Sequence, residues 1–100
     1  MPIPDDPLLR SLLPLFCSEW ELDLGERWWA GVHARRDTAD ARRLVHTLRG
    51  SFLQYGVDEG LPLVEALGEA VRTQDWDSAQ EAVTALSALV ADLRASLDLH

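Results

Sequence analysis

The last quarter of this chain carries an apolar repeat that strongly restricts its fold. Apolar side chains recur there at alternating intervals of four and three positions, at Ala79, Val83, Leu86, Val90, Leu93 and Leu97. This is the spacing of the buried face of an α-helix in a helical bundle. Helical spacing also recurs upstream, and no stretch of four or more residues alternates apolar and polar side chains as a strand does. We therefore expect an all-α protein, an antiparallel up-down four-helix bundle with a short additional N-terminal helix.

Proline, glycine and capping residues predict where the helices begin and end. The first helix should be short, because Pro14 and a Ser18–Glu21 capping box interrupt its apolar spacing and open a second helix. The third helix should run from about Thr38 to Tyr55. The remaining boundary signals are an extended lead-in over 1–7, a polar break over 35–38, Gly56 after the third helix, Pro62 in the first turn of the fourth and Asp75 before the fifth.

Length and charge limit the classes of function. A chain of 100 residues forms one domain, 1–100, and its net charge of −8 at pH 7 should repel nucleic acid and anionic membranes. The single cysteine, Cys17, excludes an internal disulfide, and no apolar run approaches the roughly 20 residues of a membrane span. The first residues lack the basic and apolar regions of a signal peptide, so we expect a cytoplasmic protein. We expect a monomer, because the predicted helices leave no spare apolar stripe.

The predicted third helix presents a histidine to solvent. On a helical wheel its apolar side chains gather on one side, at Ala41, Leu44, Val45, Leu48, Phe52 and Tyr55. His46 lies roughly 150° from the centre of that stripe and should therefore face water. An exposed histidine on a helix is usually only a solvated residue, so its neighbours decide whether a function is indicated.

Three features around His46 are unusual for a solvent-exposed helix face. Gly50 lies four residues on, in a helix interior, where glycine costs about 1 kcal/mol relative to alanine but leaves the imidazole uncrowded. Leu53 is an apolar residue on the same solvent face. All nine basic residues are arginines, and five of them fall between Arg35 and Arg49. Cationic side chains around an exposed imidazole suit a bound anion, for which phosphate is the obvious candidate.

The segment LVHTLRGS at residues 44–51, with Gly56 ten residues after His46, resembles the core motif of histidine-containing phosphotransfer (HPt) domains. In that family the motif is histidine, any residue, leucine, lysine and glycine, with a second glycine at the offset of Gly56. The resemblance covers about residues 10–97. It implies a phosphorelay intermediate, whose histidine accepts a phosphoryl group from an aspartyl phosphate of a response-regulator receiver domain and passes it to another receiver.

The resemblance also implies roles for individual residues. His46 would be the phospho-acceptor, Arg49 would hold the place of the family lysine that pairs with the phosphoryl oxygens, and Gly50 would give steric clearance. Arginine in place of lysine keeps the charge but changes reach and geometry. The expected docking residues are Arg42, Arg43, Leu53 and Gln54, and Gly56 is expected to be structural. The implied partners are receiver domains and a hybrid sensor histidine kinase, with Mg²⁺ on the receiver and no cofactor on this chain.

Other interpretations of these residues stay open. Arg42 and Arg43 are equally well explained as solvated helix residues, and Ser51 and Gln54 as ordinary surface polar groups. Two other functions are compatible with the sequence: an adaptor that binds receivers or kinases without phosphotransfer, and a fragment of a larger sensor kinase. The chain has no glycine-rich nucleotide loop, so we expect no autokinase activity.

The remaining aromatic and sulfur-containing residues are expected to be structural. His33 should lie at the edge of the core, His100 is terminal, and the histidines show no metal-ligand spacing, so we expect no metal site. Cys17 should be a small buried hydrophobe. The tryptophans expected to pack in the core and at its edge are Trp20, Trp28, Trp29 and Trp76.

Overall fold

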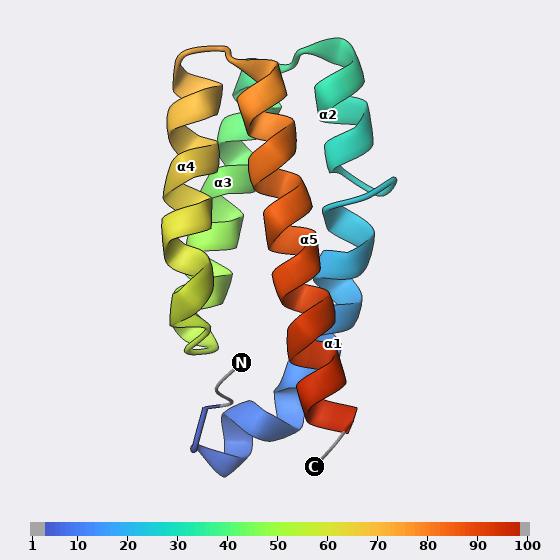
Figure 1. The fold of residues 1–100 in the computed structure, drawn as a ribbon, viewed down its shortest axis with the longest axis vertical. Coiled ribbons are helices and arrows are strands. Elements are labelled where there is room, and N and C mark those ends of the chain that lie inside the picture. The colour runs from blue at the N-terminus through green and yellow to red at the C-terminus, as the bar shows by residue number, and fades with distance from the viewer. Residues whose placement is uncertain (1–3, 99–100) are drawn as a thin grey trace.

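Five α-helices follow one another along residues 4–98, the part of the chain that the computed structural model describes (Figure 1). They are α1 (Pro7–Asp23), α2 (Trp29–Arg35), α3 (Thr38–Gln54), α4 (Leu61–Arg72) and α5 (Trp76–Asp98), and the 3-10 turn η1 (Asp58–Gly60) precedes α4. These described residues contain no strand, so the predicted all-α class is confirmed.

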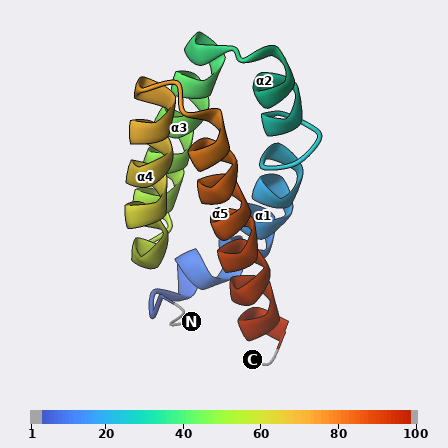
Figure 2. The same cartoon turned by 45° about the horizontal axis from the view of Figure 1, so that its top comes forward.

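Neighbouring helices pack antiparallel. α3 packs against α4, α4 against α5, and α5 against α1, and the members of each pair run in opposite directions (Figure 1). The short helix α2 continues beyond the end of α1, so that α1 and α2 lie end to end, and α2 packs against α3 (Figures 1 and 2). One edge of α3 therefore faces α4, and the other faces α1 and α2.

The predicted interruption at Ser18 is wrong, because α1 runs without a break from Pro7 to Asp23. Both members of the expected capping box are bound to another helix instead: Ser18 Oγ accepts a hydrogen bond of 2.8 Å from Arg94 Nη2, and Glu21 forms an ion pair with the same guanidinium. Buried side chains also continue on one face of α1 on both sides of Pro14, at Leu13, Phe16, Cys17 and Trp20. The short helix is therefore α2, and not the first helix.

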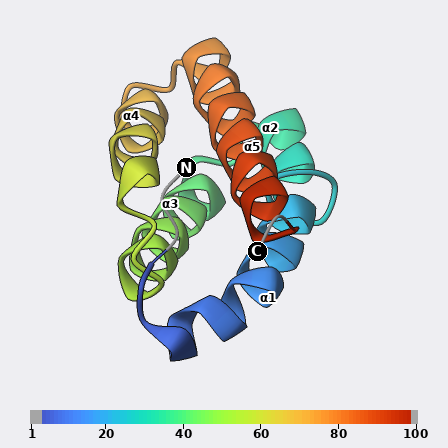
Figure 3. The ribbon, with the colours of Figure 1, turned by 60° about the horizontal axis from the view of Figure 1, so that its bottom comes forward.

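Helix α1 is bent, and its first turns cross beneath the end of the bundle (Figures 1 and 3). Pro14 lies inside it, and a proline within a helix removes a hydrogen bond and kinks the axis.

The outer face of α1 carries four exposed leucines, Leu8, Leu12, Leu15 and Leu22. The expectation that the helices leave no apolar stripe exposed is therefore wrong. The monomeric state stays a prediction, which sedimentation analysis of the protein can test. Within residues 4–98, no helix combines the length and apolar character that crossing a membrane requires.

The break between α1 and α2 at residues 24–28 was not predicted, whereas the boundaries at residues 35–38, Gly56, Pro62 and Asp75 agree closely with those predicted from the sequence. Asp37 caps α3 by accepting a hydrogen bond of 3.0 Å from the backbone N–H of Asp40. Gly56 follows α3 with a φ of 69°, a left-handed conformation that favours glycine. Asp75 accepts a hydrogen bond of 3.1 Å from the backbone N–H of Ser78 at the start of α5. These signals act within a few residues, which explains why they could be recognised in the sequence.

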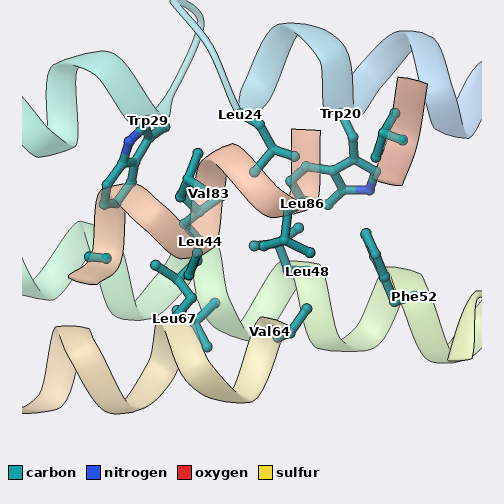
Figure 4. Close-up of a cluster of buried hydrophobic side chains, with 14 of the residues drawn as sticks. Trp20, Leu24, Trp29, Leu44, Leu48, Phe52, Val64, Leu67, Val83 and Leu86 are labelled. Atoms are coloured by element: carbon teal, nitrogen blue, oxygen red, sulfur yellow. The ribbon is translucent and has the colours of Figure 1, made fainter. Parts of the chain in front are cut away.

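The core lies along the inner faces of all five helices (Figure 4). The predicted inner face of α3 is confirmed, because Leu44, Leu48 and Phe52 are fully buried and Tyr55, which follows the helix, is half-buried. The Phe16 ring of α1 contacts Phe52, with ring centroids 5.0 Å apart. This packing fixes the rotation of α3 about its axis, and with it the side chains that α3 presents to solvent.

Candidate functional site in the α3–α4 hollow

His46 lies near the middle of α3 and is exposed to solvent, as the helical wheel predicted. Its orientation follows from the core, since Leu44 and Leu48 are fully buried on the opposite side of the helix. The imidazole is therefore presented by a rigid helix and not by a loop. This placement suits a side chain that must meet a partner in a defined orientation.

A hollow of about 300 Å³ lies beside His46 between α3 and α4. Its lining residues are Arg42, Val45, His46 and Arg49 from α3, and Glu65, Gly68, Glu69, Val71 and Arg72 from α4. We call this feature the α3–α4 hollow. Its two valines are buried, whereas its histidine and most of its charged side chains are exposed. It therefore has an apolar floor and a rim of charged groups.

Gly68 allows α4 to approach α3 closely at this point. A Cβ atom on Gly68 would lie 3.3 Å from Val45 Cγ1 and 3.8 Å from Arg49 Nη2. A side chain here would press on Val45 and would take up space in the α3–α4 hollow. The missing side chain of Gly68 thus helps to keep this hollow open.

Gly50 faces open space. Among the residues that the structure describes, no atom outside its own helical surroundings lies within 4 Å of where its Cβ would be. Its φ is not in the left-handed region, so neither packing nor backbone conformation requires glycine at this position. A glycine in a helix interior destabilises the helix, so its presence calls for an explanation outside the folded chain. Close approach of a partner to the helix one turn from His46 is such an explanation.

The guanidinium groups around the α3–α4 hollow differ in their pairing. Arg49 donates from Nε to Glu65 Oε1 at 2.7 Å, which links α3 to α4. Arg72 donates from Nε to Glu69 Oε2 at 2.9 Å within α4, and this hydrogen bond holds the pKa of the Glu69 carboxyl below its usual value. Arg42 is exposed and has no hydrogen-bond or ion-pair partner within residues 4–98. One of three guanidiniums is thus free to bind an added anion.

The other residues predicted for the site lie on α3 outside this hollow. Leu53 is 57% exposed, and Gln54 is exposed at the end of the helix. Arg43 pairs with Asp40 at 3.2 Å, and its guanidinium lies 6.0 Å from the centre of the Trp28 ring. The structure thus brings His46, Arg42 and Arg49 together, whereas Arg43, Leu53 and Gln54 belong to the surrounding surface of α3.

The contribution of α4 to this hollow was not predicted from the sequence. Glu65, Glu69 and Arg72 recur at intervals of four and three residues, which places them on one face of the helix. That periodicity indicates a charged face but does not indicate that it borders His46. The neighbourhood depends on how α3 and α4 pack, which includes the close approach of the two helices at Gly68.

The residues expected to be structural do pack as predicted. His33 is half-buried, with ring centroids 5.4 Å from Trp29 and 6.4 Å from Trp76. Cys17 is buried, and this burial raises the pKa of its thiol. In the described part of the chain, no group of three or more His, Cys, Asp or Glu side chains is placed to hold a metal ion. His100 lies outside the described residues.

Comparisons of the chain with known protein families, with curated protein sequences and with solved structures found no match.

Proposed function

We propose that this chain is a stand-alone histidine phosphotransfer protein of a two-component phosphorelay. In this proposal the five helices form an HPt-like bundle, in which α1 and α2 together make one of four antiparallel columns. His46 accepts a phosphoryl group from a receiver-domain aspartyl phosphate and passes it to another response regulator. The protein acts in the cytoplasm as a monomer, with receiver domains and a hybrid sensor histidine kinase as partners.

The observation that carries the proposal is the open position of His46. Its imidazole is exposed on a rigid helix, beside a hollow rimmed by three arginines and next to a glycine whose outer side is empty. Neutral imidazole is nucleophilic near pH 7, and phosphoryl transfer needs mainly alignment and neutralisation of charge. These features match what the resemblance to HPt domains implies for this position.

The transfer exchanges one phosphorus bond for another. A nitrogen of His46 forms a bond to phosphorus as the bond from phosphorus to the aspartyl oxygen breaks, which leaves the receiver carboxylate free. The same exchange in reverse passes the phosphoryl group to a second receiver. The receiver brings its own Mg²⁺, so this chain supplies the nucleophile, guanidinium groups and a docking face. Gly50 admits the partner, and Arg49 pairs with the phosphoryl oxygens once it is released from Glu65.

The docking face surrounds His46 on α3. Leu53 offers an exposed apolar side chain, Gln54 offers a polar one, and Arg42 and Arg43 offer positive charge to an acidic receiver site. This charge is local, because the chain as a whole carries a net charge of −8. The face therefore favours partners whose acidic groups surround the reacting aspartate.

The direct test is transfer from a receiver that carries phosphate on its aspartate. We expect the protein to gain acid-labile, base-stable phosphate, and the His46→Gln variant to gain none. The matched control is His33→Gln, which removes a half-buried histidine near the start of α5 and should leave transfer intact in a folded variant. Absence of label on the unaltered protein, or equal label on His46→Gln, would contradict the proposal.

The second candidate is an adaptor that binds receivers without turnover. The pairing of Arg49 with Glu65 favours it, because this guanidinium already has a carboxylate partner. Stable receiver binding with no transfer in either direction would support the adaptor in place of the relay.

A further inference from the structure

We propose that Glu65 is the counter-ion that Arg49 must give up when His46 is phosphorylated, and that this exchange keeps the phosphoryl group easy to pass on. The inference rests on the proposed function and adds a residue of α4 to it. Glu65 would be a positioning residue, because it acts through Arg49 and not on the phosphoryl group itself.

The geometry sets Arg49 between two acceptors. It lies three residues after His46 and lines the same hollow, while its Nε lies 2.7 Å from Glu65 Oε1. Side chains on a helix lean towards its N-terminus, which directs Arg49 back over the turn that holds His46. Its side chain is 40% exposed and that of Glu65 is 62% exposed, so the pair can open without a change in the core.

A phosphoryl group is the stronger acceptor for a guanidinium. It carries nearly two negative charges and three oxygens, whereas a carboxylate carries one charge and two oxygens. Arg49 is therefore drawn to phosphorylated His46, but it must first leave Glu65. The phosphorylated state is consequently less stable than it would be with an unpaired Arg49. An intermediate that receives and donates the same group benefits from such a limit on its stability.

The second ion pair of the α3–α4 hollow does not have this arrangement. Glu69 and Arg72 lie three residues apart on α4, so their pair is local to that helix. The Arg49–Glu65 pair instead joins α4 to the helix that carries His46. Glu65 is thus the carboxylate whose removal changes what Arg49 can do.

A small phosphoryl donor tests this inference without any receiver. With potassium phosphoramidate, a nitrogen of His46 bonds to phosphorus while the phosphoramidate P–N bond breaks, and the imidazole proton leaves with the departing nitrogen as ammonia. At a fixed ratio of phosphoramidate to ammonia, ³¹P NMR measures the amount of phosphorylated His46, and the known total protein concentration then gives the ratio of phosphorylated to free His46. We expect Glu65→Gln to raise this ratio about two- to fivefold, which is the effect expected from an exposed ion pair.

Two comparisons isolate the role of Arg49. Glu19→Gln removes the same charge from an exposed ion pair with Arg27, away from the α3–α4 hollow, and should leave the ratio unchanged. In an Arg49→Gln background, Glu65→Gln should no longer raise the ratio, because the guanidinium that it frees is missing. An unchanged ratio in Glu65→Gln alone, or an equal rise in the Arg49→Gln background, would overturn the inference.

The experiment also separates this inference from the proposed function. If phosphoramidate labels His46 but no receiver exchanges phosphate with it, the relay is contradicted while the Glu65 comparison still decides the counter-ion role. If His46 takes no label at all, both proposals fail together.

Discussion

Gly50 and Gly60 differ in what an added Cβ atom would meet in this fold. A Cβ on Gly60 would lie 2.1 Å from Cε2 of the buried Phe52 ring, so the approach of η1 to α3 depends on the missing side chain. A Cβ on Gly50 would meet open space. The first glycine is thus explained by packing within the chain, whereas the second has no internal explanation and supports the proposed approach of a partner.

Alanine substitutions at these two positions should change stability in opposite directions. We expect Gly50→Ala to raise the free energy of unfolding by about 0.5–1 kcal/mol, because alanine is the better helix former. We expect Gly60→Ala to lower it by about 1–3 kcal/mol, because Phe52 must move. Urea denaturation measures both values.

Gly50→Glu should fold normally and yet block phosphotransfer, because its side chain would occupy the space that the partner needs. Efficient transfer by that variant would contradict the role of Gly50.

At the scale of the helix, local signals and distant contacts can disagree. α3 and α5 begin where their caps predict, because Asp37 and Asp75 bond to backbone N–H groups three residues away. Ser18 and Glu21 form an equally good local signal, but Arg94 of α5 binds both of them and α1 continues. A capping signal therefore does not by itself set the boundary of a helix.

The cap of α5 predicts a pH-dependent contribution to stability. Hydrogen bonds from the side chain and the backbone of Ser78 lower the pKa of Asp75 from its ordinary value of 3.8. The ionised carboxylate therefore stabilises the fold fully above pH 3.8, and this contribution is lost as the pH falls through the lower pKa of the folded state. We expect Asp75→Ala to lower the melting temperature at pH 7, and the difference from the unaltered protein to shrink in acid.

The control for this prediction is Asp77→Ala, which removes a carboxylate from the first turn of α5 without removing the cap. It should lower the melting temperature less than Asp75→Ala does. Equal effects of the two variants would show that charge near the helix terminus, and not the cap, is responsible.

At the scale of the whole molecule, charge is distributed unevenly. The chain has a net charge of −8, yet most of its arginines lie on or just before α3. An acidic partner is repelled by the molecule as a whole but attracted to this one face. In the proposed relay, this charge distribution favours the orientation in which a receiver meets His46.

Reversing one charge on this face should slow association with a receiver. Arg42 and Arg10 are both exposed, and neither has an ion-pair partner within residues 4–98. Arg42 lies beside His46, and we expect Arg42→Glu to lower the association rate roughly tenfold at low salt. Arg10→Glu on α1 makes the same change in net charge away from His46 and should lower the association rate much less. Stopped-flow measurements at two salt concentrations compare them. Equal slowing by both variants would mean that net charge alone controls the encounter.

The sequence by itself determined the all-α class, the extent of α3, the starts of α4 and α5, and the exposure of His46. Apolar spacing, caps and glycines act within a few residues, so each of these features is visible in a short window. Only the tertiary structure decided that α1 continues through Ser18, that Glu65 binds Arg49, and that the charged face of α4 borders His46. These features join residues that are far apart along the chain, and packing between helices determines which of them meet.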